Sequence, residues 1–529
     1  MDIATTRTPE QDEALHAIER LVQFAFDHHL IKEEDVDYSR NLLMDLFHFS
    51  EPFAYEVDRT MQDSPQIMID TLIQYGYHIG LMPENTDTYR DLLDSKIMGL
   101  LMARPSEVIA EFEDISKNQG IEAATEHFYK MNIDSNYIRM DRVSKNVYWK
   151  QATAYGDIEM TINLSKPEKN SKEIAMAKLL PPPIYPKCQL CRENVGYAGR
   201  INHPSRQNLR VIPLVMNDEP WLFQYSPYVY YNEHCIIFHR DHVPMKLTKD
   251  TLKRLLSFVD IAPHYFIGSN ADLPIVGGSI LTHDHFQGGR HTFPIQNAPK
   301  EALFTHDEYP EVSVSIVKWP MSVLRITSQD SQVLLECANN IYELWKQYSD
   351  PNADILAFTK NESGKDVPHN TVTPIVHRSV DGAYEMDLVL RNNRTDEQYP
   401  DGIFHPHPEM HHIKKENIGL IEVMGLAILP GRLKEELDLV ANILSGDKEL
   451  YTSSIAGEVP MLVQHIDWIK SLVSEHGNQH HKDEAVQLIQ HKVGCKFVEI
   501  LGHAGVYKRT EAGQQAFKLF LQHLGYEQA

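Results

Sequence analysis

The stretch "GGSILTHDHFQGGRHTF", Gly277 to Phe293, gathers side chains whose types and spacing could do chemistry. Along an extended chain, alternation puts His283, His285 and Gln287 on one face, because successive strand side chains point to opposite sides. The apolar residues of "LPIVGGSIL" predict a strand that delivers these groups at its end. Glycine weakens a strand unless the backbone must approach something closely. The segment therefore favours a site over the alternative, an edge strand with a solvated histidine face.

The chemistry that this pattern favours is phosphoryl transfer. A neutral imidazole is a competent nucleophile toward phosphorus, and the phosphoramidate that it forms can pass the group onward. Backbone N–H groups around Gly278 and Gly288 could cradle the phosphate oxygens where charge builds up. Gln287 cannot give up a proton, but its amide can donate a hydrogen bond to a phosphoryl oxygen. This favours a leaving group that needs no protonation, such as a sugar 1-phosphate, whose second pKa is about 6 like that of other phosphomonoesters.

A second chemical feature is the C-x-x-C of Cys188 and Cys191. Two thiolates at that spacing can be half of a tetrahedral zinc site. No second pair of ligands follows at zinc-finger spacing, so the residues alone leave zinc and a pair of reduced structural thiols equally open. The chain has only 5 cysteines in 529 residues, which does not form a disulfide framework.

The net charge restricts the partners. It is −24, from 74 acidic and 50 basic residues, and repels nucleic acid and anionic membrane over most of the surface. A small phosphate ligand is compatible with it, because a local arginine cluster outweighs a distant field screened beyond ~8 Å. The first residues carry no basic segment followed by an apolar one, and no apolar run approaches the ~18 residues of a membrane span. We expect a cytoplasmic protein with neither nucleic acid nor membrane as a partner.

The elements that position these groups follow from the apolar periodicity. Residues 1–165 predict helices with one hairpin at "VYWKQATAYGDIEMTINL", and the proline-rich residues 166–187 predict a linker. Residues 188–305 and 306–430 each combine short strands, an amphipathic helix and an H-x-H, which indicates a duplication by element order. Residues 431–529 again predict helices. The fold class is therefore α+β, a duplicated antiparallel sheet core between helical flanks.

These motifs together resemble a known family. H-x-H-x-Q with an upstream C-x-x-C is similar to the transferase branch of the histidine-triad superfamily, and closest to the UDP-glucose:hexose-1-phosphate (galactose-1-phosphate) uridylyltransferases. The stretches "CQLCRENVGYAGRINHPSRQNLRVIPL", "HCIIFHRDHVPM" and "EVMGLAILPGRLKEEL" resemble the longer bacterial class across essentially the whole chain. The resemblance implies a ping-pong exchange. His285 would attack the α-phosphorus of UDP-glucose and release glucose 1-phosphate, and galactose 1-phosphate would then take the uridylyl group to give UDP-galactose.

The resemblance also implies roles for single residues. Gln287 would hold the uridylyl phosphate, and Zn²⁺ would be bound by Cys188, Cys191, His242 and His283. The residues expected at the substrates are Arg206, Asn270, Gly278, Ser279, Gly288, Arg290 and Asn370, with the two arginines equally compatible with a solvated surface. A homodimer is the candidate assembly. The shorter class has Pro and Gly where this chain has Asp284 and Phe286, which leaves the local backbone path open.

Two alternatives are open at this point. "FHPHPEMHH" contains His405-Pro406-His407, which reproduces the His-Pro-His of the shorter class, but Glu409 stands where Gln is required and no Gly-Gly surrounds it. We expect a sugar-side or structural role there. The alternative function is a nucleotide-sugar or dinucleotide phosphorylase of the same superfamily, because phosphate also needs no general acid. A metal-stabilised nucleotide-binding protein without turnover is the alternative from another class.

Overall fold

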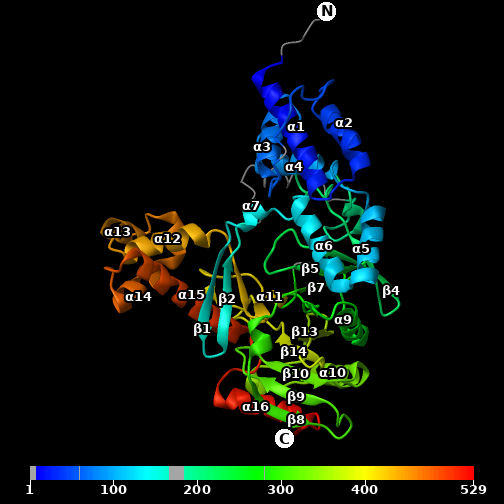
Figure 1. Cartoon of the computed structure of the whole chain (residues 1–529). Helices are drawn as coiled ribbons and strands as arrows, with labels where there is room; N and C mark the ends of the chain where they lie inside the picture. Colours follow the sequence, from blue (N-terminus) through cyan, green and yellow to red (C-terminus); the bar gives the residue numbers. More distant parts are fainter. Residues whose placement is uncertain (1–6, 59, 166–183, 279) are drawn as a thin grey trace, which may run out of the picture.

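A computed structural model describes residues 7–58, 60–165, 184–278 and 280–529 of the chain. Most of the expected linker, and Ser279 among the expected substrate residues, fall outside the described residues. The amino-terminal helices gather at one end of the molecule, and the helices α12, α13 and α14 form a lobe at its side (Figure 1).

The amino-terminal region is helical as predicted. Thr8 begins the first helix with a capping box, in which its hydroxyl accepts from Gln11 N–H while the Gln11 side chain accepts from Thr8 N–H. Apolar side chains on several helices, including Leu21, Leu72 and Ile97, form a core of their own. The helices are α1 (Pro9–Asp27), α2 (Val36–Leu46), α3 (Gln66–His78), α4 (Asp87–Gly99), α5 (Pro105–Gln119), α6 (Ile121–Asp134) and α7 (Met140–Val143).

The middle of the chain forms an 11-stranded sheet in the order β16-β8-β9-β10-β14-β13-β6-β7-β5-β4-β3. Its first part consists of β3 (Ile212–Met216), β4 (Glu219–Tyr225), β5 (Cys235–His239), α9 (Lys249–Ile261), β6 (Phe266–Gly268) and β7 (His285–Gly289). Its second part consists of β8 (Lys300–Thr305), β9 (Ser313–Val317), β10 (Val323–Ser328), α10 (Ser331–Trp345), β13 (Asn370–Arg378) and β14 (Tyr384–Asn392). The small hairpin β11 (Phe358–Lys360) and β12 (Asp366–Pro368) precedes β13.

The strand order confirms the duplication. The first half runs β3-β4-β5-β7-β6 and the second half runs β8-β9-β10-β14-β13, and the halves meet where β6 pairs antiparallel with β13. Two details differ from the sequence-based expectation. Strand β8 belongs to the second half by this order, although it was placed at the end of the first. The counterpart of β7 is β14, so His405-Pro406-His407, which follows β14 outside any strand, does not repeat the first motif's position.

The two faces of the sheet differ in polarity because neighbouring residues of a strand point to opposite sides. On one face Ile237, Phe286 and Val376 belong to a large apolar core. Helices α9 and α10 contact each other and this part of the sheet. The register of the strands places His285, Gln287 and, in the second half, Asp387 on the other face. His285 and Gln287 therefore lie on the face away from α9 and α10.

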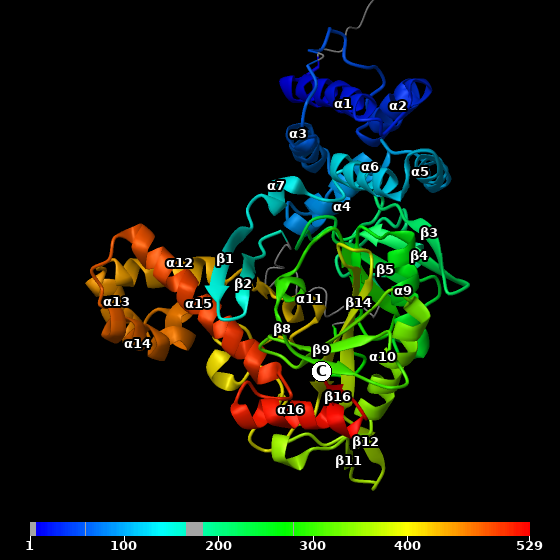
Figure 2. The same cartoon turned by 60° about the horizontal axis from the view of Figure 1, so that its bottom comes forward.

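The carboxy-terminal region follows α11 (Leu420–Val423) and β15 (Leu426–Leu429). It consists of α12 (Leu433–Leu444), α13 (Lys448–Ile455), α14 (Ile466–His476), α15 (Lys482–Ala504), α16 (Glu511–His523) and β16 (Glu527–Gln528). Strand β16 pairs with β8 at the edge of the sheet, and α16 lies beside it (Figure 2). No helix of the described residues is long and apolar enough to cross a membrane.

The predicted hairpin forms β1 (Val147–Thr153) and β2 (Gly156–Ile162), but its partners come from the far end of the chain. Strand β15 pairs parallel with β2. Helix α15 packs on β1 so closely that a Cβ on Gly494 would lie 2.4 Å from Gln151 Cγ. Ile158 and Met160 of β2 share an apolar core with Ile375 of β13, so the hairpin joins the carboxy-terminal region to the face of the large sheet that carries His285 and Gln287.

Candidate active site

Strand β7 begins at His285, so the expected strand leading into the histidines is wrong. The described residues between β6 and β7, 269–278 and 280–284, belong to no strand, and the backbone turns back so tightly that a Cβ on Gly277 would lie 2.6 Å from the carbonyl oxygens of Ala271 and Leu273. Glycine is needed there because the backbone approaches itself closely. His283 belongs to this loop, two residues before the strand begins. His285 and Gln287 lie on the strand itself and share a face.

The four expected metal ligands come together. The Sγ atoms of Cys188 and Cys191 lie 3.5 Å apart, Cys188 Sγ lies 3.2 Å from His283 Nδ1, and Cys191 Sγ lies 3.2 Å from His242 Nδ1. All four ligand atoms are within 4.8 Å of one another, so the cluster could hold a metal ion. His283 Nε2 donates to the carbonyl oxygen of His239 at 2.7 Å, which leaves Nδ1 as the ligand atom.

His285 is oriented by the same loop. Its Nδ1 lies 2.9 Å from the carbonyl oxygen of His283, to which it donates, and the side chain is buried. The donated proton fixes the tautomer and leaves Nε2 with a free lone pair. Burial lowers the pKa of His285, although the hydrogen bond to His283 opposes the shift. A neutral imidazole with one free nitrogen at a cavity wall is what nucleophilic attack on phosphorus requires.

Gln287 has a partner that the sequence did not reveal. His234 Nε2 lies 3.1 Å from Gln287 Oε1, and His234 Nδ1 lies 3.1 Å from the carbonyl oxygen of Tyr228. Burial lowers the pKa of His234 to about 4, so the imidazole is neutral near pH 7 and its single N–H can be donated to only one of these two oxygens. The only available signal was strand pairing. Ile236 pairs with Gln287, so His234, two residues earlier, comes to the same face.

His285 and Gln287 line a cavity of about 650 Å³. One wall comes from the segment around Tyr228 and His234, and a second wall from the segment around Asn417 together with α11, which contains Glu422. Glu422 accepts from Lys414 Nζ at 2.9 Å and from Gly419 N at 3.2 Å, and both charged side chains are buried. In the sequence, the stretch that begins at Glu422 carried part of the resemblance, but no motif singled out Lys414, Asn417 or Gly419 of this second wall.

Three of the expected substrate residues line the cavity: Arg206, Asn270 and Gly278. The Asn270 Oδ1 atom accepts from Leu420 N at 2.9 Å, which ties the loop before the motif to the second wall. A Cβ on Gly278 would lie 2.7 Å from Asn270 Nδ2, so the glycine lets the two segments meet.

Three others lie elsewhere. A Cβ on Gly288 would meet Phe266 O at 2.7 Å, and the residue lies on the face opposite to His285 and Gln287. Arg290 pairs with Glu122 of α6. Asn370 donates to the carbonyl oxygens of Trp345 and Tyr348 at 2.8 Å each, so its amide anchors the end of α10. None of the three lines the cavity.

The second histidine motif supports the cavity from outside. His405 is buried and its Nε2 lies 3.2 Å from Oδ1 of Asn417, a residue of the cavity wall. His407 stacks on His503 of α15 with ring centroids 4.0 Å apart. Neither histidine lines the cavity.

Comparison with known proteins agrees with this arrangement. The family model for the galactose-1-phosphate uridyl transferase N-terminal domain matches residues 30–244, and that for the C-terminal domain matches residues 258–450. Curated proteins named galactose-1-phosphate uridylyltransferase are similar over nearly the whole chain. The one from Caldanaerobacter subterraneus is 55% identical over 98% of this chain and 99% of its own length. Those from Halalkalibacterium halodurans and Bacillus subtilis are 50% and 48% identical over 96% of this chain, and over 98% and 97% of their own lengths.

These matches identify the chain as a nucleotidyltransferase. More particularly, the chain belongs to the galactose-1-phosphate uridyl transferase family, which confirms the resemblance seen in its motifs. A solved structure, yeast Ap4A phosphorylase Apa2, is 12% identical with a TM-score of 0.29, covering 63% of this chain and 88% of its own. That likeness is too weak to support an inference.

Proposed function

We propose that the enzyme transfers UMP from UDP-glucose to galactose 1-phosphate through a uridylyl group on His285. The observation that carries this proposal is the buried imidazole at the cavity wall, whose Nδ1–H is held by the His283 carbonyl at 2.9 Å. The names of the relatives favour the substrates.

In the first half-reaction the lone pair of His285 Nε2 attacks the α-phosphorus of UDP-glucose. The bond between that phosphorus and the bridging oxygen breaks, and glucose 1-phosphate leaves with the electron pair. In the second half-reaction a phosphate oxygen of galactose 1-phosphate attacks the same phosphorus and the P–N bond breaks, which returns the neutral imidazole. The Gln287 amide would hold a phosphoryl oxygen in both steps, where charge builds up. Neither step needs a proton donor.

The test is to trap the intermediate. UDP-glucose labelled in the uridylyl phosphate is mixed with the enzyme without acceptor, and label that precipitates with protein and is released by mild acid is counted. We expect about one label per active site in the wild type and none in His285→Asn. Label retained by His285→Asn would contradict the assignment. The matched control is His503→Asn, which should retain label like the wild type because His503 lies outside the cavity.

The phosphorylase alternative is separated by the acceptor. We expect glucose 1-phosphate and UDP-galactose to accumulate together with galactose 1-phosphate, and little turnover with inorganic phosphate. Release of glucose 1-phosphate only with inorganic phosphate would contradict the proposal and favour a phosphorylase.

We further propose that Zn²⁺ occupies the cluster of Cys188, Cys191, His242 and His283. Two thiolates and two imidazoles are a donor set typical of tetrahedral zinc. Bound there, the ion would fix His283 and, through its carbonyl, the imidazole of His285. Metal analysis of purified protein tests this, with one zinc per chain expected in the wild type and much less in Cys188→Ser. The matched control is Cys337→Ser, because Cys337 lies outside the cluster. The cytoplasmic location and the homodimer stay predictions.

A further inference from the structure

The turn before β5, residues 231–234, contains a residue in a conformation that its type disfavours. Glu233 has a φ of +52°, in the left-handed region, which residues other than glycine adopt mainly as asparagine or aspartate. Such strained residues persist only where their surroundings hold them, and they cluster at functional sites. The next residue is His234, whose Nε2 lies 3.1 Å from Oε1 of Gln287. The strained position is therefore the direct neighbour of the side chain that supports Gln287.

The 231–234 turn packs against strand β7 just beyond Gln287. The Tyr231 hydroxyl donates to the carbonyl oxygen of Gly288 at 3.1 Å. A Cβ on Gly289 would lie 2.7 Å from the carbonyl oxygen of Glu233, so glycine is what lets the two backbones approach this closely. The backbone conformation at Glu233 therefore decides where the imidazole that follows it lies relative to β7.

The side chain of Glu233 is held from several directions. It is only 4% exposed, and glutamate is rarely buried without partners. The Tyr265 hydroxyl donates to Oε2, Asn232 Nδ2 donates to Oε1 at 3.2 Å, and Arg290 Nη1 lies 3.9 Å from Oε1. Burial raises the pKa of Tyr265 well above its ordinary value, so the phenol keeps the proton that it donates. These contacts fix the carboxylate and, with it, the left-handed backbone.

Two of these partners connect the carboxylate to helix α6. Arg290 also pairs with Glu122. The Tyr225 hydroxyl lies 2.8 Å from the Tyr265 hydroxyl and 2.8 Å from the carbonyl oxygen of Thr125, and its single proton is donated to one of these two oxygens. Glu122 and Thr125 both belong to α6. The turn is thus tied to the amino-terminal helical region.

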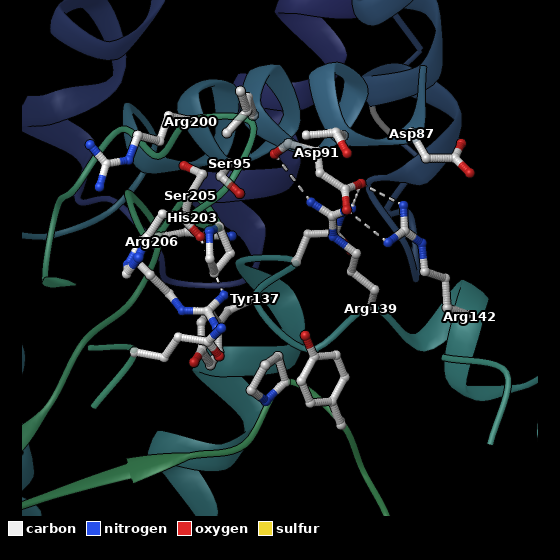
Figure 3. A pocket seen from close by; sticks show the side chains of 18 of the residues that line it. Asp87, Asp91, Ser95, Tyr137, Arg139, Arg142, Arg200, His203, Ser205 and Arg206 are labelled. Carbon is white, nitrogen blue, oxygen red and sulfur yellow. Dashed lines mark hydrogen bonds and ion pairs between the residues drawn. The ribbon is translucent and has the colours of Figure 1, made fainter. Parts of the chain in front are cut away.

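Helix α6 is itself fixed among the other helices. It packs on α5. Beyond its end, Arg139 and Arg142 both bind the carboxylate of Asp91 in α4, as the dashed lines in Figure 3 mark. A turn tied to such a group of helices is preorganised, which is how a supporting residue holds a catalytic side chain in its productive geometry.

We propose that Glu233 is a positioning residue for the transfer reaction. Its carboxylate, held by Tyr265 and Arg290, keeps the turn in the left-handed conformation that sets His234 against Gln287. The Gln287 amide is thereby aimed at the place where charge builds up on the phosphoryl oxygen. This inference rests on the proposed function, because it takes Gln287 to hold a phosphoryl oxygen during transfer.

The first test is Tyr265→Phe, which removes only the hydroxyl that holds the carboxylate. The matched control is Tyr342→Phe, because Tyr342 is also buried and its hydroxyl donates to the carbonyl oxygen of Leu247 at 3.3 Å, outside the turn and its partners. We expect Tyr265→Phe to lower the kcat for transfer about 3- to 10-fold, as for the loss of one hydrogen bond. The KM of either substrate should change less than about twofold. Tyr342→Phe should keep the kcat of the wild type, and thermal unfolding should show a similar loss of stability in both variants.

Glycine at position 233 separates the backbone conformation from the carboxylate. Because glycine adopts a positive φ readily, Glu233→Gly would leave kcat unchanged if the conformation alone mattered. We expect kcat to fall at least as far as in Tyr265→Phe, since the turn loses its tie to α6. A Glu233→Gly enzyme with the kcat of the wild type would overturn the inference.

A double variant asks whether the effect passes through Gln287. If it does, Tyr265→Phe added to Gln287→Ala should cause no further loss of kcat, whereas an effect on the fold alone would multiply the two losses. Multiplied losses, or a Tyr265→Phe enzyme that behaves like Tyr342→Phe, would overturn the inference. A wild type that releases glucose 1-phosphate only with inorganic phosphate would overturn the proposed function instead. The same variants, compared by that phosphorolysis rate, would then still decide the role of Glu233.

Discussion

The two halves of the sheet share one strand order but use it in opposite ways. In the first half, strand β7 presents His285 and Gln287 to a cavity, and the free nitrogen of His285 is available to a ligand. In the second half, the corresponding strand β14 presents Asp387 on the same face, where it forms a bidentate ion pair with Arg325 of β10 at 2.7 and 2.8 Å.

At this position of the second half, all the side-chain nitrogens of Arg325 are engaged. Arg325 also donates to the carbonyl oxygens of Gln296 and Ile295, at 2.9 Å each, and its side chain is almost fully buried. These carbonyls belong to the short helix η3 (Pro294–Asn297), so this helix lies directly against the ion pair. The same place in the repeated sheet thus opens onto a cavity in the first half and holds a buried, fully paired ion pair in the second half.

The largest effect is expected from removing one partner of the buried ion pair in the second half of the sheet. Asp387→Asn leaves the buried charge of Arg325 without its ion partner, and loss of one partner from a buried pair costs about 3–5 kcal/mol. The free energy of unfolding in urea should fall by that amount. The kcat for transfer, measured at urea concentrations below the unfolding transition, should stay close to that of the wild type. A marked fall in this kcat for the folded protein would contradict the separation of roles.

The corresponding change in the first half of the sheet is Gln287→Ala, which should affect the rate and not the stability. Removing one preformed donor to a phosphoryl oxygen typically costs about 10²–10³ in rate. The kcat for transfer should fall by that factor, while the unfolding transition should shift little because Gln287 is only half-buried. A large loss of stability with near-normal kcat would show that Gln287 is structural.

A smaller effect is expected from His234→Phe, which removes the side chain that orients Gln287. The kcat should fall about 3- to 10-fold, as for the loss of one hydrogen bond. If His234 acts only through Gln287, the double variant with Gln287→Ala should be no slower than Gln287→Ala alone. Additive losses in the double variant would assign His234 a separate role.

The smallest expected effect concerns Glu385 in the second half, whose contribution to the stability of the fold depends on pH. Burial alone would raise the pKa of Glu385, but the hydrogen bond from His377 and the charge of Arg325 outweigh burial and hold this pKa at about 2. Lys300 Nζ also contacts the carboxylate, at 3.2 Å. Because this pKa lies below the ordinary 4.5, the carboxylate stabilises the fold above pH 4.5, and the contribution is lost as pH falls toward 2.

We therefore expect the melting temperature of Glu385→Gln to depend less steeply on pH between about 4.5 and 2 than that of the wild type. Glu385→Gln should also be less stable near neutral pH. Thermal unfolding over this pH range measures both, and parallel curves for the two proteins would contradict the assignment.

The sequence predicted the groups whose position follows from local alternation. His285 and Gln287 share a face because they are two residues apart on one strand. It could not place groups that depend on distant partners. Arg206 and Arg290 looked equivalent, but Glu122 of α6 engages Arg290, while Arg206 lines the cavity of His285 and Gln287.

The start of β7 was also mispredicted, for a physical reason. The apolar residues before it suggested a strand, but the turn of the backbone at Gly277 makes a loop that sends His283 to the cysteines. His-Pro-His in the second half was likewise ambiguous, because only the strand order shows that β14, and not this motif, corresponds to β7. The α+β class and the two helical flanks needed only periodicity, and both were correct.

The parallel pairing of β15 with β2 also bears on the order of assembly. The ribosome delivers the hairpin β1–β2 early, but its third strand emerges only after nearly the whole large sheet has been made. Contacts between such distant segments form late because loop closure must precede them. During translation the hairpin therefore has an unpaired edge, and nascent chains stalled before residue 426 should be the most prone to aggregate or to need a chaperone.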